Sequence, residues 1–131
     1  MLDGSGIDIL IVDDEQFILD SLTGFLEDYE FNVTSAGSAE AALNLITEKE
    51  FQAAIIDLRL PGISGDMLIK KINSVHPETR FVIHTGSVGY MLSEDLKSIG
   101  MKKEHVFFKP VPDLTVLVEA VLKLMEEHSE N

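Results

Sequence analysis

The sequence predicts a doubly wound α/β domain, in which five parallel strands form one sheet with helices on both faces. Two observations predict this fold: five short apolar runs rich in β-branched residues, and longer segments of helical period between them. Because a crossover between parallel strands is right-handed and needs a helix, this alternation favours a parallel sheet. A chain of 131 residues has the size of one domain, so we expect a single domain over residues 1–131.

The five apolar runs are the expected strands. They are short and mostly continuous in apolar residues, which is typical of strands buried on both faces of a parallel sheet. In chain order they cover residues 7–12, 31–36, 53–58, 81–84 and 106–108.

Five amphipathic segments are the expected helices, because their apolar residues recur at spacings of three and four and so share one face. These faces hold Ile18, Leu22, Phe25, Leu26 and Tyr29; Ala39, Ala42, Leu43 and Ile46; Leu68, Ile72 and Val75; Leu92, Leu96 and Ile99; and Leu114, Leu117, Val118, Val121, Leu122 and Met125. Ser38 is expected to cap the second helix, and Asp113 stands at the start of the last. The core is expected over about residues 7–125, with a fraying polar tail at 126–131.

The charge balance is strongly acidic. Ten lysine and arginine residues against twenty-three aspartate and glutamate residues give a net charge of −13, which disfavours direct binding to nucleic acid or to an anionic membrane surface.

Without cysteine the chain has no disulfide, thiolate nucleophile or cysteine-based zinc site. The sequence shows neither a signal peptide nor an apolar run long enough for a membrane span, so we expect a soluble, cytoplasmic protein.

Charged or hydroxyl-bearing side chains follow four of the five expected strands. Asp13 and Asp14 follow the first, Asp57 lies at the end of the third, Thr85 follows the fourth and Lys109 follows the fifth. The carboxyl ends of parallel strands meet at one edge of a doubly wound sheet, which is where such sheets bind ligands. We therefore expect these side chains to converge there.

The charges of this group predict a bound cation. The three carboxylates repel one another in one cleft, Lys109 offsets one charge, and a divalent cation would offset the other two. Carboxylates and water suit Mg²⁺. A carboxylate held beside Mg²⁺ and a lysine is a potential nucleophile toward phosphorus, and Thr85 is placed to hydrogen-bond the oxygens of the acyl phosphate formed.

Four segments of the sequence carry a family resemblance. The segments VDDE at 12–15, DLRLPGISG at 57–65, TG at 85–86 and KP at 109–110 together resemble the receiver domain of two-component response regulators, in particular the chemotaxis-like receivers. The resemblance spans essentially the whole chain, from Ile7 to about Met125. It implies a flavodoxin-like fold with strand order 2-1-3-4-5. It also implies a phosphorylation-dependent switch that assists only its own phosphorylation and dephosphorylation, rather than an enzyme with an external substrate.

The resemblance assigns roles to the acidic residues. It implies that Asp57 is the phosphoacceptor, which takes its phosphoryl group from a sensor histidine kinase or a histidine phosphotransfer protein. Asp14 and Asp57, with the backbone carbonyl of Arg59, are implied as direct ligands of Mg²⁺, and Asp13 is implied to act through water.

The resemblance also assigns roles at the other strand ends. Lys109 is implied to pair with Asp57 and then with the phosphoryl group, and Thr85 to move toward that group. A cis bond between Lys109 and Pro110 is implied, which aims the lysine into the site. The fourth helix, fifth strand and fifth helix are implied to form the surface that switches and the place of a homodimer.

The sequence departs from the family pattern at the fifth strand. Family members carry tyrosine or phenylalanine three residues before the lysine, and here that position is Val106. Phe108 lies on the same side of the strand and is the candidate replacement. Gly86 should leave access to the phosphoryl group open, and Arg59 and Ser87 occupy positions that tune the lifetime of the acyl phosphate in the family.

Each of these residues taken alone also has an ordinary structural explanation. Asp13 and Asp14 are typical helix-capping residues, Asp57 suits a turn, Thr85 suits a strand end, and lysine is usually a surface residue. Four such explanations would have to coincide at four strand ends, so the functional interpretation is favoured. The four histidines lack metal-binding spacing, and we expect them to be structural or solvated.

Two other functions stay open at this point. A phosphatase of the haloacid dehalogenase-like type needs a second aspartate two residues after the nucleophile, where this chain has Arg59. A flavin carrier needs a phosphate-binding loop after the first strand, where acidic residues would repel the phosphate. We expect either a stand-alone receiver or the front of a longer regulator, with no output domain following in this chain.

Overall fold

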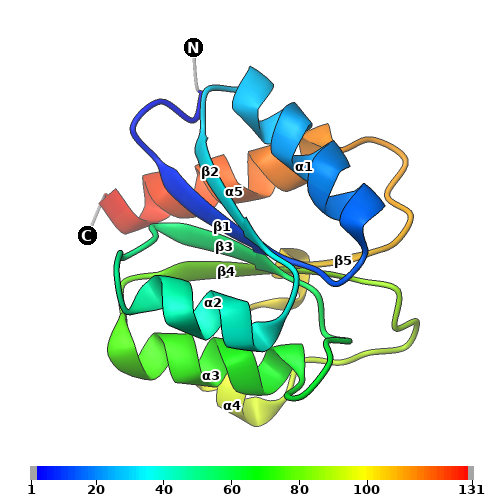
Figure 1. Cartoon of the computed structure of the whole chain (residues 1–131). Helices are drawn as coiled ribbons and strands as arrows, with labels where there is room; N and C mark the ends of the chain where they lie inside the picture. The colour runs from blue at the N-terminus through cyan, green and yellow to red at the C-terminus, as the bar shows by residue number, and fades with distance from the viewer. Residues whose placement is uncertain (1–2, 130–131) are drawn as a thin grey trace.

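The structure, a computed structural model, describes residues 3–129 and forms a five-stranded parallel sheet between two layers of helices (Figure 1). The strands are β1 (Asp8–Val12), β2 (Asn32–Ala36), β3 (Ala53–Ile56), β4 (Arg80–Thr85) and β5 (Val106–Phe108). They lie in the order β2-β1-β3-β4-β5, and every neighbouring pair is parallel. The predicted fold class and strand order are confirmed.

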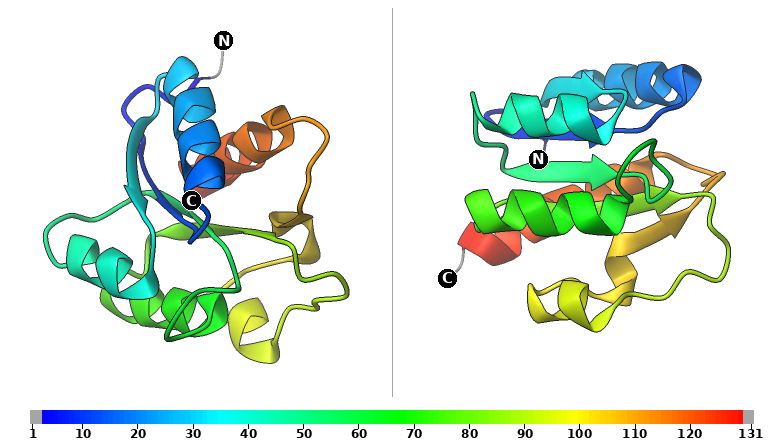
Figure 2. Two further views of the ribbon diagram at one scale, coloured as in Figure 1. Left: turned by 45° about the vertical axis from the view of Figure 1, so that its right-hand side comes forward. Right: turned by 60° about the horizontal axis from the view of Figure 1, so that its bottom comes forward.

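The helices are α1 (Gln16–Asp28), α2 (Ala39–Ile46), α3 (Gly65–Val75), α4 (Glu94–Ser98) and α5 (Thr115–Ser129), with a 3₁₀ turn, η1 (Lys103–His105), before β5. Helices α1 and α5 cover one face of the sheet, and α2, α3 and α4 cover the other (Figures 1 and 2). The predicted cap of α2 is present, since Ser38 Oγ accepts a hydrogen bond from the N–H of Ala41 at 3.1 Å. Within residues 3–129, no helix is both long enough and apolar enough to cross a membrane.

Alternate residues of the central strands pack into two apolar layers. In β1, Leu10 and Val12 face α2 and α3, whereas Ile9 and Ile11 face α1 and α5. All four side chains are fully buried. A strand buried on both faces needs apolar residues at successive positions, which is why continuous apolar runs predicted the strands. Because the strands are packed on both faces, the loops at their carboxyl ends are held in fixed positions.

Four of the five predicted strands differ from the structure at their ends, and β1 and β2 each begin one residue later than expected. The expected strand at 53–58 ends at Ile56, and the chain then enters a tight loop in which the N–H of Gly65 donates to the carbonyl of Leu58 at 2.9 Å. The expected strand at 81–84 is longer at both ends. Its first residue, Arg80, donates its N–H to the carbonyl of Gln52, and the carbonyl of its last residue accepts from the N–H of Lys109.

Two predicted helices also differ from the structure at their ends. The expected fourth helix, whose apolar face runs from Leu92 to Ile99, is shortened to α4, because Ser93 Oγ caps the N–H of Leu96 at one end and Gly100, with φ of +101°, follows the other. The polar segment expected to fray after Met125 continues α5 as far as Ser129, since it holds no glycine or proline that would stop a helix. The last two residues of the expected tail, 130 and 131, lie outside the described residues.

Candidate functional site

The first part of the site lies at the carboxyl end of β1. Asp13 follows Val12 directly, and its N–H donates to the carbonyl of Ala36 at 3.2 Å. The Asp13 side chain is buried, and its Oδ1 accepts a hydrogen bond from the N–H of Glu15 at 2.9 Å. These two bonds fix the turn from β1 into α1, at which Asp14 is exposed.

The second part of the site is the loop between β3 and α3. Asp57 is buried, its N–H donates to the carbonyl of Val12 at 2.9 Å, and its Oδ1 accepts from the N–H of Arg59 at 3.3 Å. Gly65 packs directly beneath this loop. A Cβ atom at Gly65 would clash with the carbonyl oxygen of Asp57 and would lie 2.7 Å from Cα of Leu58. The loop can therefore close under Asp57 only because position 65 has no side chain.

The three predicted carboxylates meet at this edge of the sheet. One carboxylate oxygen from each of Asp13, Asp14 and Asp57 lies within 4.8 Å of the other two. Oxygen donors gathered in this way, with two carboxylates buried and one open to water, fit a hard divalent cation that retains part of its hydration shell. The donor set therefore fits Mg²⁺.

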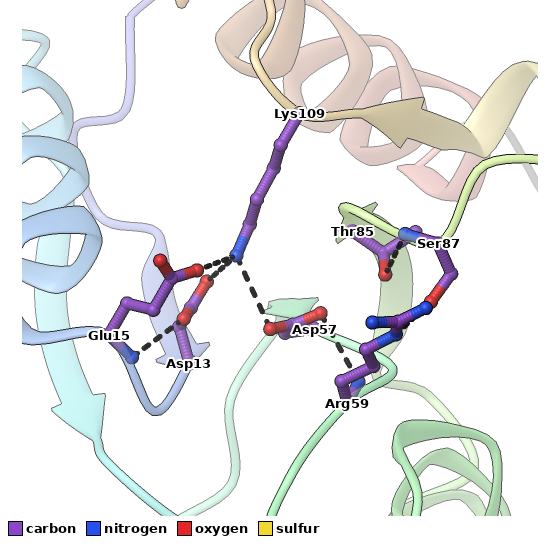
Figure 3. Close-up of polar contacts among 7 residues, drawn as sticks. All are labelled: Asp13, Glu15, Asp57, Arg59, Thr85, Ser87 and Lys109. Atoms are coloured by element: carbon purple, nitrogen blue, oxygen red, sulfur yellow. Dashed lines mark hydrogen bonds and ion pairs between the residues drawn. The ribbon is translucent and has the colours of Figure 1, made fainter.

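Lys109 extends from the end of β5 into this acidic group (Figure 3). Its Nζ lies 2.7 Å from Oδ2 of Asp13, 2.9 Å from Oε2 of Glu15 and 3.3 Å from Oδ2 of Asp57. The backbone positions the lysine, because its N–H donates to the carbonyl of Thr85 at 2.7 Å. The bond from Lys109 to Pro110 is cis, as the resemblance implied.

Burial and charge act against each other at Lys109. Burial by itself lowers the pKa of the Lys109 ammonium, but the hydrogen bonds to Asp13 and Glu15, together with the negative charges of Asp13 and Asp57, outweigh burial and raise this pKa above its ordinary value. Burial also raises the pKa of Asp13, in spite of the lysine and the N–H of Glu15. The lysine is therefore held as a cation throughout the neutral range.

Glu15 is a partner of Lys109 to which the sequence analysis gave no role. It follows the acidic pair in the sequence, but a glutamate at the start of a helix is common for capping alone. Only the approach of β5 to the β1–α1 turn shows that Glu15 contacts the lysine, across 94 residues of chain.

Thr85, Ser87 and Arg59 form a second polar group around Asp57. The Thr85 side chain is fully buried, and its Oγ1 accepts a hydrogen bond from the N–H of Ser87 at 3.2 Å. Arg59 Nε donates to Ser87 Oγ at 2.8 Å. In Figure 3 these residues lie on one side of Asp57, and Lys109, with its other carboxylate partners, lies on the opposite side. All five predicted strand-end residues thus gather at one edge of the sheet.

The fifth strand shows the consequence of the departure at Val106. Val106 is half-buried against the apolar layer of α2, α3 and α4. Phe108 pairs in register with Thr85, and 40% of its surface is exposed. The candidate replacement for the switch aromatic therefore stands beside the threonine at the surface.

His84 is the most unusual histidine near the site. It is buried between Ile83 and Thr85 on β4, and its Nδ1 has no hydrogen-bond partner in the described structure. Burial, assisted by the charge of Lys109, lowers the pKa of His84 to about 4. The imidazole is therefore neutral at pH 7, which agrees with the structural role expected for it.

The fold and the site define an α/β domain with an acidic, cation-compatible centre beside a fixed lysine. Residues 9–122 match the response regulator receiver domain family, and the chain belongs to this family. It is a receiver domain of the kind found in response regulators, and the family acts as a signalling switch.

Curated relatives include two transcriptional regulatory proteins. YesN of Bacillus subtilis, named as uncharacterized, is 28% identical over 130 residues, which covers 93% of this chain and 35% of that protein. FixJ of Bradyrhizobium diazoefficiens is 28% identical over 120 residues, which covers 90% of this chain and 58% of that protein. The chain thus spans between about a third and three fifths of the length of these relatives.

Solved structures match over nearly their whole length. A CheY-like receiver domain protein of Methanospirillum hungatei has a TM-score of 0.76 and 29% identity, and the match covers 95% of this chain and 98% of that one. The response regulator TrrA of Thermotoga maritima, in complex with Mg²⁺ and BeF, has a TM-score of 0.75 and 26% identity, and the match covers 90% of this chain and 98% of that one.

Proposed function

We propose that Asp57 is the residue of this receiver domain that accepts a phosphoryl group. The observation that carries the proposal is a buried Asp57 carboxylate with Oδ2 at 3.3 Å from the Lys109 ammonium, within a group of three carboxylates. An oxygen of Asp57 attacks phosphorus of a phosphohistidine, so that a phosphorus–oxygen bond forms while the phosphorus–nitrogen bond breaks. The electron pair of the broken bond stays on the imidazole nitrogen, and the product is an acyl phosphate.

Asp13, Asp14 and Asp57, with the backbone carbonyl of Arg59, are proposed to hold Mg²⁺, Asp13 acting through water. When bound, the ion offsets negative charge on the carboxylates and on the transferred group. The closeness of the three carboxylates supports this, as does the presence of Mg²⁺ and BeF in the similar structure of TrrA.

Lys109 and Thr85 are proposed to bind the oxygens of the phosphoryl group. Lys109 retains its charge at neutral pH and already contacts Asp57, so it can stabilise the charge that develops in the transfer. The Thr85 hydroxyl accepts a bond from the N–H of Ser87, and its own O–H is left to donate to a phosphoryl oxygen.

The proposed role is that of a single receiver domain over the whole chain, with core residues at about 7–125, acting in the cytoplasm. Its phosphoryl donor is proposed to be a sensor histidine kinase or a histidine phosphotransfer protein, and its homodimer to form through α4, β5 and α5. The domain is proposed to assist only its own phosphorylation and dephosphorylation. In a phosphatase of the haloacid dehalogenase-like type the second position after the nucleophile is an aspartate that serves as acid and base, and this chain has Arg59 there.

The test is incubation with acetyl phosphate and Mg²⁺, followed by intact-mass measurement. We expect the wild type to gain one phosphoryl group and Asp57→Asn to gain none. Asp20→Asn, the same change at an exposed position of α1, serves as the matched control and should react as the wild type does. Equal uptake by the wild type and Asp57→Asn would remove Asp57 from its proposed role.

A further inference from the structure

Two side-chain hydrogen bonds join the segment between β4 and α4 to the β3–α3 loop and to the start of α3. Arg59 Nε, from the β3–α3 loop, donates to Ser87 Oγ at 2.8 Å. The hydroxyl of Tyr90 donates to the Asp66 carboxylate at the start of α3, at 3.1 Å from Oδ1 and 3.2 Å from Oδ2. Both anchoring groups are charged and both bound groups are hydroxyls, so each contact is a charge-assisted hydrogen bond.

Ser87 and Tyr90 are the two ends of one turn. The N–H of Tyr90 donates to the carbonyl of Ser87 at 3.2 Å, and Gly89 has φ of +87°, the backbone conformation that a type II turn requires at its third residue. Because the turn is closed by its own hydrogen bond, a displacement of Ser87 is passed to Tyr90. The turn 87–90 is therefore one unit, held at its first residue by Arg59 and at its last by Asp66.

Arg59 is also the neighbour of the proposed phosphoacceptor. Its N–H donates to Oδ1 of Asp57 at 3.3 Å, so its side chain begins beside the carboxylate and reaches from there to Ser87 (Figure 3). The guanidinium now binds a neutral hydroxyl oxygen. A phosphoryl group on Asp57 would offer it several oxygens and about two negative charges, and hydrogen bonds between charged partners are roughly twice as strong as neutral ones. The guanidinium would therefore favour the phosphoryl group over Ser87.

We propose that Arg59 senses the phosphoryl group and holds the turn 87–90 in place only while Asp57 is unmodified. Once Asp57 carries the phosphoryl group, the Arg59 guanidinium leaves Ser87 Oγ for the phosphoryl oxygens, and the turn is freed at its first residue. The proposal rests on the proposed function, because it needs a phosphoryl group on Asp57.

Tyr90 provides the measurement. The chain has no tryptophan and two tyrosines, so Tyr29→Phe leaves Tyr90 as the one fluorescent side chain of this kind. Tyrosine emission is quenched when its hydroxyl donates to a carboxylate, as Tyr90 does to Asp66. In the Tyr29→Phe protein, acetyl phosphate and Mg²⁺ should raise Tyr90 emission in proportion to the phosphate uptake measured by intact mass.

Arg59→Ala in the same background is the decisive variant. The Arg59 side chain is exposed, so the change should leave the fold intact. Because Arg59 adjoins Asp57 and the proposed Mg²⁺ site, we expect phosphate uptake to be reduced, and the emission of the two proteins is compared at equal uptake measured by intact mass. Most of the emission change should be lost at equal phosphate uptake, because the turn is already free of Arg59 before phosphorylation. Lys71→Ala removes an exposed cation of α3 and is the matched control, which should keep the full change.

Three results would overturn the proposal in distinguishable ways. The same emission change in Arg59→Ala as in the background at equal uptake would show that Arg59 does not hold the turn. Phosphate uptake by the background without any emission change would show that the turn is not released. An absence of uptake in the background would instead refute the proposed function itself, and the inference with it.

Discussion

The Nζ atom of Lys109 lies closer to Oδ2 of Asp13, at 2.7 Å, than to Oδ2 of Asp57, at 3.3 Å. The family resemblance implied Asp57 as the partner of the lysine, and the structure adds Asp13 and Glu15 as nearer partners. Asp13 is also a proposed participant in metal binding. A divalent cation bound at this site would therefore compete with the lysine for the Asp13 carboxylate, since both are attracted by its negative charge.

Lys109→Met should destabilise the protein in the absence of Mg²⁺ and tighten its binding of Mg²⁺. Removing the ammonium leaves buried carboxylates without their cation, which costs on the order of 3 kcal/mol. The same loss removes a competitor, so the Mg²⁺ dissociation constant should fall about tenfold, the equivalent of 1.4 kcal/mol. Urea unfolding and calorimetric titration measure the two effects. Unchanged Mg²⁺ affinity would contradict the competition, and Lys71→Met, at an exposed position, should alter neither quantity.

Asp57→Asn should have the opposite effect on stability without Mg²⁺. The change removes one of three mutually repelling carboxylates, and the remaining two are better matched by Lys109. We expect a gain on the order of 1–3 kcal/mol in the free energy of unfolding, from like charges about 5 Å apart at intermediate dielectric. Added Mg²⁺ should stabilise the wild type far more than the variant. A variant less stable than the wild type without Mg²⁺ would contradict this account.

His84 should make the protein sensitive to acid. Its pKa is about 4 in the folded protein against 6.5 as its ordinary value, so the unfolded chain takes up a proton between these pH values and the folded protein does not. Stability is therefore fully present above pH 6.5 and declines as the pH falls toward 4. By pH 4.5 the loss due to this group should be on the order of 2–3 kcal/mol.

His84→Phe provides the comparison for this prediction. Urea unfolding of both proteins at pH 7.5 and at pH 4.5 gives the change in stability for each, whatever the absolute effect of the substitution. The wild type should lose more than the variant by the amount expected for His84. Equal losses in the two proteins would show that His84 is not the titrating group.

Gly65→Ala should destabilise the protein and disturb the site above it. The added Cβ would clash with the carbonyl oxygen of Asp57 and lie 2.7 Å from Cα of Leu58, and both are backbone atoms that cannot move aside alone. We expect a loss of about 1–3 kcal/mol and weaker Mg²⁺ binding. Gly24→Ala is the control, since Gly24 lies inside α1 with no atom near its Cβ position. There alanine should stabilise by about 0.5–1 kcal/mol. Similar effects of the two changes would contradict the prediction.

Most of the fold could be predicted because its strands are buried on both faces. Continuous apolar runs such as Ala53–Ile56 are typical of strands buried on both faces, and the helical periods between them favour parallel crossovers. The ends of elements were less accessible to sequence analysis. Whether α5 stops at Met125 or continues depends on small local preferences, and nothing in the polar residues that follow marks an end.

The sequence predicted which residues form the site, but not which of them contact one another. Parallel topology brings the carboxyl ends of strands together, so Asp13, Asp57 and Lys109 had to meet once the fold was known. The choice of partners within that group depends on distances of a few tenths of an ångström, which no spacing in the sequence encodes. Glu15 and Ser87 gained their roles in this way, as contacts across 94 and 28 residues of chain.

The sheet, the helix layers and the set of side chains at the carboxyl edge follow from the amino-acid sequence alone, because burial and chain connectivity act on patterns that the sequence displays. Three features are seen only once the chain is folded: Lys109 lies nearest Asp13, Arg59 binds Ser87, and His84 is buried with an Nδ1 that has no hydrogen-bond partner within residues 3–129. Each of these follows from how separate loops and strands approach one another in space, and that approach is fixed by packing of the whole domain rather than by any local segment.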